Sequence, residues 1–323
     1  MRGAQVFTIG RTSFTEIVRQ PVYGLMVLGT LAAYALSPAI SMFSLGSDRS
    51  VLKDFGVSTL FIAGVFLSAF AASRVVGREL ANRTALILLS KPVGRGVFLV
   101  GKFLGILSAV TVASFLFTLA LLLAARMGPP ESAHAPVDWP VVTAACGAFL
   151  LALAAGAISS YRAAHSSRPF GMVTLKAACW TLPLGFLVAG FFDRGWHPQQ
   201  FAAAFDPEVP TAFDPHLLLA ALLVLPGIFV LCSIAILFSI LWRRAAVLMT
   251  ILVFLGGLAI AGGDLPLLGL VPNFHLFWVG ELFYLEHPNL SLHYLGLAVL
   301  YSAAYSAASL SAASWLLQGR EVG

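Results

Sequence analysis

The chain has 323 residues, of which 59% are hydrophobic and only 10% are charged, and its mean hydropathy is +0.91. Soluble domains carry roughly 25% charged residues, so the composition excludes a soluble fold and predicts an all-α integral membrane protein with several spans. The net charge of +5 requires no nucleic-acid partner, because the cytoplasmic loops of membrane proteins are enriched in Lys and Arg. All three cysteines fall in apolar segments, where we expect small buried hydrophobes rather than disulfides or metal ligands.

Residues 1–20 predict an amphipathic helix that lies in the membrane interface ahead of the first span. Phe7, Phe14, Ile17 and Val18 recur at near-helical spacing, and the charged residues take the other face. The segment lacks the continuous apolar core of a cleavable signal peptide. The alternative is a disordered polar tail.

Eight apolar runs are long enough to cross a hydrocarbon core of roughly 30 Å. They lie near residues 22–43, 56–73, 98–125, 140–158, 172–192, 217–241, 246–263 and 293–316. The chain is therefore expected to form one bundle of about eight transmembrane helices, a single domain over 1–323. A six-span variant, in which 172–192 or 246–263 is re-entrant, stays open.

The second and third spans are joined by residues 74–97, where positive charge gathers. The cations of this region are Arg74, Arg78, Arg83, Lys91 and Arg95, and Lys102 follows just after it. Ala81, Ala85, Leu88 and Leu89 follow i, i+4, i+7, i+8, which indicates a short amphipathic helix parallel to the membrane. Pro92 would end it, since proline disfavours helix at the residue before it and donates no hydrogen bond. A lipid-contacting loop with ordinary cytoplasmic charge is the alternative.

Two longer connections follow, at 193–216 and 264–292. The first is rich in Pro and Asp, which favour turns and helix caps over long helices. The second is too apolar for free solvent, so we expect it at the opposite membrane interface or folded over the bundle.

The distribution of charge predicts the orientation. Eight spans place 15 of the 19 Lys and Arg residues on the N-terminal side of the membrane, and 11 of the 14 acidic residues on the other. Because Lys and Arg accumulate in cytoplasmic loops, both termini are expected in the cytoplasm of a multi-pass protein of the cell (inner or plasma) membrane.

Residues that could carry catalysis or bind a metal are few. Gly96 to Phe103 nearly spells the phosphate-binding P-loop, but Phe103 replaces the hydroxyl that holds magnesium, and an apolar span replaces the required strand context. His287 and His293 with Glu281 and Glu286 match no defined metal-site spacing. No acidic or basic residue falls near the middle of a span, which disfavours an ion-coupled secondary transporter.

The charged segment resembles the signature of ABC-2-type transporter permeases. The resemblance lies in Glu79-x-x-x-x-Thr84-x-x-x-Leu88-Leu89-Ser90-Lys91-Pro92-Val93-x-Arg95-x-x-x-Leu99-x-Gly101-Lys102. Arg83 stands where that family usually has glycine, and Gly94 where serine is common. In character the chain is similar to the permease subunits of nitrous oxide reductase maturation systems and of gliding-associated systems.

This resemblance implies a mechanism. Two permeases would pair, as a homodimer or pseudo-dimer, and two copies of a separate cytoplasmic ATPase, which binds ATP and magnesium, would dock on coupling helices and drive efflux. The implied ATPase-coupling residues are Arg78, Glu79, Arg83, Thr84, Leu88, Leu89, Lys91, Pro92 and Arg95. A second cytoplasmic contact is implied at Arg162, Arg168 and Lys176. The chain itself is expected to hold no catalytic residue, metal or cofactor. A non-translocating membrane anchor or regulatory subunit of an ATPase complex is the alternative, and a secondary transporter is the less favoured one. The substrate stays open.

Overall fold

The computed structural model describes residues 2–41, 48–81, 94–128, 137–162, 170–205, 212–242, 244–259, 271–280, 283 and 292–319. Within these ranges the chain forms α-helices and short 3-10 turns, and no β-strand. The α-helices are α1 (Arg2–Val18), α2 (Pro21–Ser41), α3 (Asp48–Ala81), α5 (Arg95–Met127), α6 (Trp139–Arg162), α7 (Phe170–Phe191), α8 (Pro215–Leu241), α9 (Ala246–Ala259) and α10 (Leu292–Gly319). The 3-10 turns are η2 (Phe201–Phe205) and η5 (Phe274–Phe277).

Seven of the described helices are long and apolar enough to cross a membrane. They are α2, α3, α5, α6, α7, α8 and α10, which confirms the all-α membrane bundle and seven of the expected spans. The remaining predicted span, 246–263, contains α9, a helix of only 14 residues. At about 1.5 Å per residue, α9 is about 21 Å long, shorter than a hydrocarbon core of about 30 Å.

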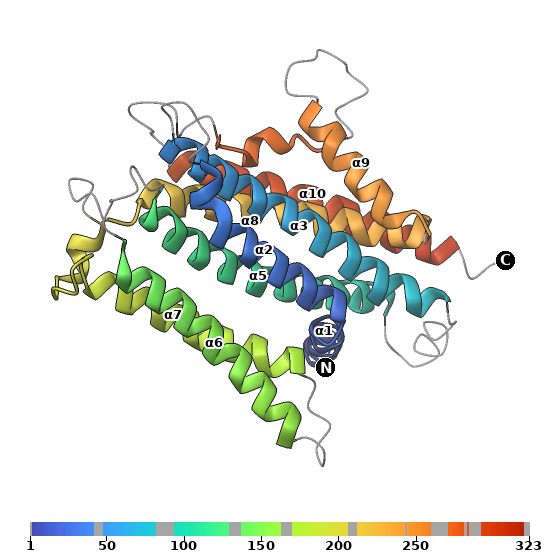
Figure 1. The fold of residues 1–323 in the computed structure, drawn as a ribbon. Coiled ribbons are helices and arrows are strands. Elements are labelled where there is room, and N and C mark those ends of the chain that lie inside the picture. Colours follow the sequence, from blue (N-terminus) through green and yellow to red (C-terminus); the bar gives the residue numbers. More distant parts are fainter. Residues whose placement is uncertain are drawn as a thin grey trace.

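The spanning helices run in roughly one direction, and α1 crosses one end of the bundle (Figure 1). At that end lie α1, the last turns of α3 and α10, and the first turn of α5. We call it the inner end, following the predicted orientation, and the opposite end the outer end. In Figure 1 α1 is seen almost along its axis while the spans lie across the page, so α1 is steeply inclined to them.

The centre of the bundle is formed by α3, α5 and α8. Helix α8 is apolar on all sides and buried along most of its length, as expected for a helix surrounded by other helices. Gly227 of α8 lets Phe61 of α3 and Phe277 of η5 approach closely, since a Cβ at Gly227 would lie 2.9 Å and 3.0 Å from their rings. Phe61 also packs on Phe254 of α9 and on Phe274, with ring centroids 5.0 Å and 6.0 Å apart. These aromatic contacts hold α9 and η5 against the core.

The described part of the 264–292 connection folds over the bundle, one of the two arrangements expected from its apolar sequence. Phe274 and Phe277 are fully buried. The His275 ring nitrogen Nε2 lies 2.6 Å from the Leu258 carbonyl oxygen of α9, and the Asn273 amide donates to the Tyr301 hydroxyl of α10 at 3.1 Å.

Helices α6 and α7 form a hairpin at one side of the bundle (Figure 1). They pack on each other through small residues. A Cβ at Gly185 would lie 3.0 Å from the Ala144 carbonyl oxygen, and the Thr181 hydroxyl donates to the Ala148 carbonyl at 3.0 Å. Large apolar residues such as Leu151 and Trp180 are exposed on the outside of the hairpin, as expected for a lipid-facing surface.

Candidate functional site

The inner ends of α3 and α5 are joined by an ion pair between Glu79 and Lys102. The Lys102 Nζ lies 2.7 Å from the Glu79 Oε1, and the Lys102 side chain is only 4% exposed. The same ammonium group lies 5.6 Å from the centre of the Phe98 ring, within cation–π range. A buried ammonium group is strongly unfavourable without a partner, so Lys102 requires Glu79 in this position. The pair ties together the two helices that flank the positively charged segment.

Helix α1 packs against α5 beside this ion pair, at glycines of both helices. A Cβ at Gly105 would lie 2.6 Å from the Gly10 carbonyl oxygen and 2.6 Å from the Ser13 Cβ. A Cβ at Gly101 would lie 2.8 Å from the Ile9 Cβ. Only residues without a side chain permit such close backbone approach. The glycines of α5 therefore hold α1 in contact with the turn of α5 that carries Lys102.

Glu16 of α1 adds a third charged group to the same region. Desolvation by burial raises the pKa of the Glu16 carboxyl above its usual value; the positive charge of Lys102 opposes this increase, and the negative charge of Glu79 adds to it. Arg78 also favours the ionised form of Glu16. Charged groups from α1, α3 and α5 thus interact electrostatically at the inner end. We call Glu16, Glu79 and Lys102 the inner charge cluster.

Helix α1 is positioned by only part of its predicted apolar face. Ile17 and Val18 are buried against the bundle, whereas Phe7 is 72% exposed. The spacing of these residues predicted one face directed at lipid. The structure uses the C-terminal part of that face, Ile17 and Val18, for protein contact. Gly101 and Gly105 of α5 instead approach the middle of α1, at Ile9, Gly10 and Ser13.

The predicted coupling residues fall partly within the described structure. Arg78 and Glu79 lie in the last turn of α3, which continues unbroken from the second span to Ala81, and Arg95 is the first residue of α5. Arg162, the last residue of α6, and Lys176 of α7 are exposed. The predicted residues outside the described ranges are Arg83, Thr84, Leu88, Leu89, Lys91, Pro92 and Arg168.

In the sequence, Lys102 was counted as a cation near the segment and as the last residue of the ABC-2-like signature, with no partner predicted for it. Its position carried a signal, because Lys102 lies inside the continuous apolar run that forms α5, where a charge is expected to have a partner. Glu79 was counted among the ATPase-coupling residues, but one of its carboxylate oxygens contacts Lys102 within the chain. The near P-loop from Gly96 to Lys102 is helical throughout, whereas phosphate binding by that motif requires a glycine-rich loop.

A family model described as ABC-2 family transporter protein matches residues 23–315. The chain belongs to this ABC-2 transporter family. No curated protein matches the chain. The matched residues include α3, α5 and the Glu79–Lys102 ion pair, whereas α1 precedes them. The chain is therefore the membrane domain of an ABC-2 transporter, and its bundle of apolar helices is the part that spans the membrane.

The Glu79–Lys102 ion pair of the inner charge cluster connects the ends of α3 and α5 in this ABC-2 membrane domain. The positively charged segment begins at the end of α3 and ends at the start of α5, and the ion pair fixes these two ends relative to each other. Among the described residues no group of three or more His, Cys, Asp or Glu side chains could hold a metal ion.

Proposed function

We propose that this chain is the permease subunit of an ABC exporter, driven by a separate cytoplasmic ATPase that docks on residues 74–97. The observation that carries the proposal is the Glu79–Lys102 ion pair at the base of this segment. A force on the segment enters the bundle through α3 and α5, which are among its most buried spans. The ion pair makes the two helix ends respond together, as a two-state transport cycle needs.

The charge of the segment suits an acidic docking surface on the ATPase. Arg78, Arg83 and Arg95 carry guanidinium groups, which bind carboxylates through two parallel hydrogen bonds. ATP and magnesium would bind in the ATPase, in two copies facing a pair of permeases. Arg162, Arg168 and Lys176 would form the second contact, at the inner end of the α6–α7 hairpin.

Copurification tests the docking. The chain is coexpressed with a separate cytoplasmic P-loop ATPase, and the Arg83→Glu/Arg95→Glu double variant is compared with Arg244→Glu. Arg244 is an exposed arginine in the turn between α8 and α9, outside both predicted contacts. Because like charges facing each other across an interface cost several kcal/mol, the double variant should lose the ATPase while Arg244→Glu retains it. Undiminished recovery of the ATPase by the double variant would contradict the proposal.

Transport is tested separately from docking. The permease–ATPase complex is reconstituted in vesicles, and ATP-dependent movement of candidate lipids, peptides and small organic compounds is measured. Movement of a compound that stops when ATP is omitted supports the exporter. An ATPase that binds the chain without moving any of these compounds supports the non-translocating anchor instead.

A further inference from the structure

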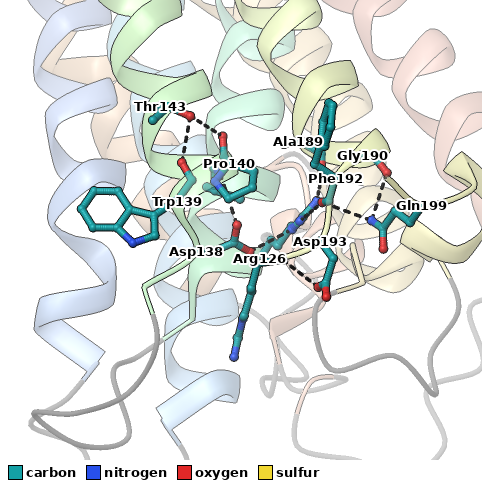
Figure 2. Close-up of polar contacts among 12 residues, drawn as sticks. Arg126, Asp138, Trp139, Pro140, Thr143, Ala189, Gly190, Phe192, Asp193 and Gln199 are labelled. Carbon is teal, nitrogen blue, oxygen red and sulfur yellow. Dashed lines mark hydrogen bonds and ion pairs between the residues drawn. The ribbon is translucent and has the colours of Figure 1, made fainter. Parts of the chain in front are cut away.

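A second buried ion pair lies at the outer end of the bundle, between Arg126 of α5 and Asp138 (Figure 2). The Arg126 Nε lies 3.1 Å from the Asp138 Oδ2, and both side chains are fully buried, at 0% exposure. The remaining guanidinium nitrogens donate to the Ala189 carbonyl and, at 2.7 Å, to the Phe192 carbonyl. The guanidinium carbon lies 5.3 Å from the centre of the Phe213 ring. Every nitrogen of Arg126 therefore has a partner.

These contacts join the ends of three helices. Arg126 lies in the last turn of α5, which ends at Met127 because Gly128 adopts a φ of 64° that favours glycine. Asp138 precedes α6 and accepts a hydrogen bond from the Val141 amide at 3.3 Å, as an N-cap residue does. Ala189 belongs to the last turn of α7, whose carbonyl groups have no partner within the helix. One ion pair thus caps the start of α6 and the end of α7 from the end of α5.

Each charge has the sign that its helix end favours. The N-terminus of a helix carries partial positive charge and the C-terminus partial negative charge. Asp138 lies at the N-terminus of α6, and the Arg126 guanidinium lies at the C-terminus of α7. Exchanging the two residues would keep an ion pair, but it would place each charge at the helix end that disfavours it.

In the described residues the two helices of the α6–α7 hairpin pack mainly on each other, and less extensively on α5 and α1. The anchor therefore adds to a limited contact with the rest of the bundle. At the outer end Phe186 of α7 packs on Phe213, with ring centroids 4.4 Å apart. At the inner end α7 approaches α1, where a Cβ at Gly171 would lie 3.4 Å from the Val18 carbonyl oxygen. The inner end of the same hairpin carries Arg162 and Lys176.

We propose that Arg126 is a positioning residue that anchors the α6–α7 hairpin to α5. The anchor sets the position of the hairpin's inner end relative to the inner end of α5. One predicted ATPase contact ends in the first turn of α5, and the other lies on the hairpin. The two contacts are then linked through the buried Arg126 guanidinium group at the opposite end of the bundle. The link between contacts rests on the proposed function, whereas the anchoring of the hairpin does not.

Spin-label distances in the full chain, reconstituted in lipid nanodiscs without any ATPase, test this proposal. The three native cysteines are replaced by alanine, and one label pair joins Leu104 of α5 to Ile158 of α6, both exposed. A second pair, Leu150 of α6 and Leu184 of α7, reports on the hairpin itself. The variants are Arg126→Lys, which keeps the charge but loses the forked donor, and the charge swap Arg126→Asp/Asp138→Arg. Lys53→Met is the control, because it removes another ion pair of the outer end, Lys53–Asp214.

Arg126→Lys and the charge swap should each broaden the Leu104–Ile158 distance distribution at least twofold and leave the Leu150–Leu184 distribution unchanged. Lys53→Met should change neither. Wild-type distance distributions in both Arg126 variants would overturn the proposal. A wild-type Leu104–Ile158 distribution in the charge swap alone would also overturn it, since any ion pair at these two positions would then suffice. Broadening within the hairpin would also overturn it, because Arg126 would then fold the hairpin rather than position it. Because the nanodiscs contain no ATPase, these results do not depend on whether the ATPase docks.

Discussion

Glu79 and Lys102, which are 23 positions apart in the chain, meet at the inner end of the bundle with a nitrogen–oxygen distance of 2.7 Å. The lysine is almost inaccessible and the carboxylate is 21% exposed. This contact joins the end of α3 to the start of α5, the two helices that flank the positively charged segment. Removal of one partner from a buried ion pair lowers the free energy of unfolding more than replacement of both partners does.

Lys102→Met should therefore lower the free energy of unfolding by about 3 kcal/mol, since it leaves the Glu79 carboxylate without its buried counter-charge. The double variant Glu79→Gln/Lys102→Met should recover most of this loss. Thermal unfolding in detergent measures both variants. Additive losses in the double variant would show that the two side chains do not stabilise each other.

Gly105→Ala should weaken the attachment of α1 to α5. The added methyl group meets the Gly10 carbonyl oxygen at 2.6 Å, so the backbone of α1 must move, at a cost of about 1–3 kcal/mol. Limited proteolysis near the N-terminus and thermal unfolding would both report the change.

The matched control for Gly105→Ala is Gly147→Ala in α6. A Cβ at Gly147 meets no atom within 4 Å, and alanine favours a helix interior over glycine by roughly 0.5–1 kcal/mol. The control should be neutral or stabilising. An equal loss of stability in both variants would mean that close packing against α1 is not the cause.

Glu16 should make stability depend on pH. Burial raises the pKa of Glu16 in the folded protein, so the folded state binds more protons than the unfolded state at pH values between the ordinary pKa of 4.5 and the higher folded pKa. The free energy of unfolding contributed by Glu16 therefore falls as pH rises through this window and stays lower above it.

Glu16→Gln removes this dependence. The variant should gain stability at neutral pH relative to wild type, and the difference should shrink as pH falls toward 4.5. Thermal unfolding measured over this range, with Glu16→Asp as the variant that keeps the charge, tests the sign. A difference that grows toward low pH would contradict the raised pKa.

The predicted orientation can be measured directly. A reporter that is active only in the cytoplasm should be active when fused after Gly94 and inactive when fused after His197. The reason is that Lys and Arg concentrate at the end of the bundle that carries Gly94. The reverse pattern would place both termini outside.

The sequence alone determined the class of the protein and the course of its spans. Apolar runs of about 20 residues are strong signals because unpaired backbone groups cannot remain in hydrocarbon. Seven of the eight predicted spans are accordingly membrane-length helices. The resemblance of residues 79–102 to the ABC-2 signature likewise led to the family whose model matches residues 23–315.

Only the tertiary structure decided which charges are partners. In the sequence, no partner was predicted for Lys102, and Arg126 and Asp138 entered only through the charge count of the two sides. In the structure each of the three is buried in an ion pair. Sequence spacing does not reveal such pairs, because they join helices whose relative position depends on packing. The glycines of α5 matter because α1 packs on them. The ends of α6 and α7 meet Arg126 only in the assembled bundle.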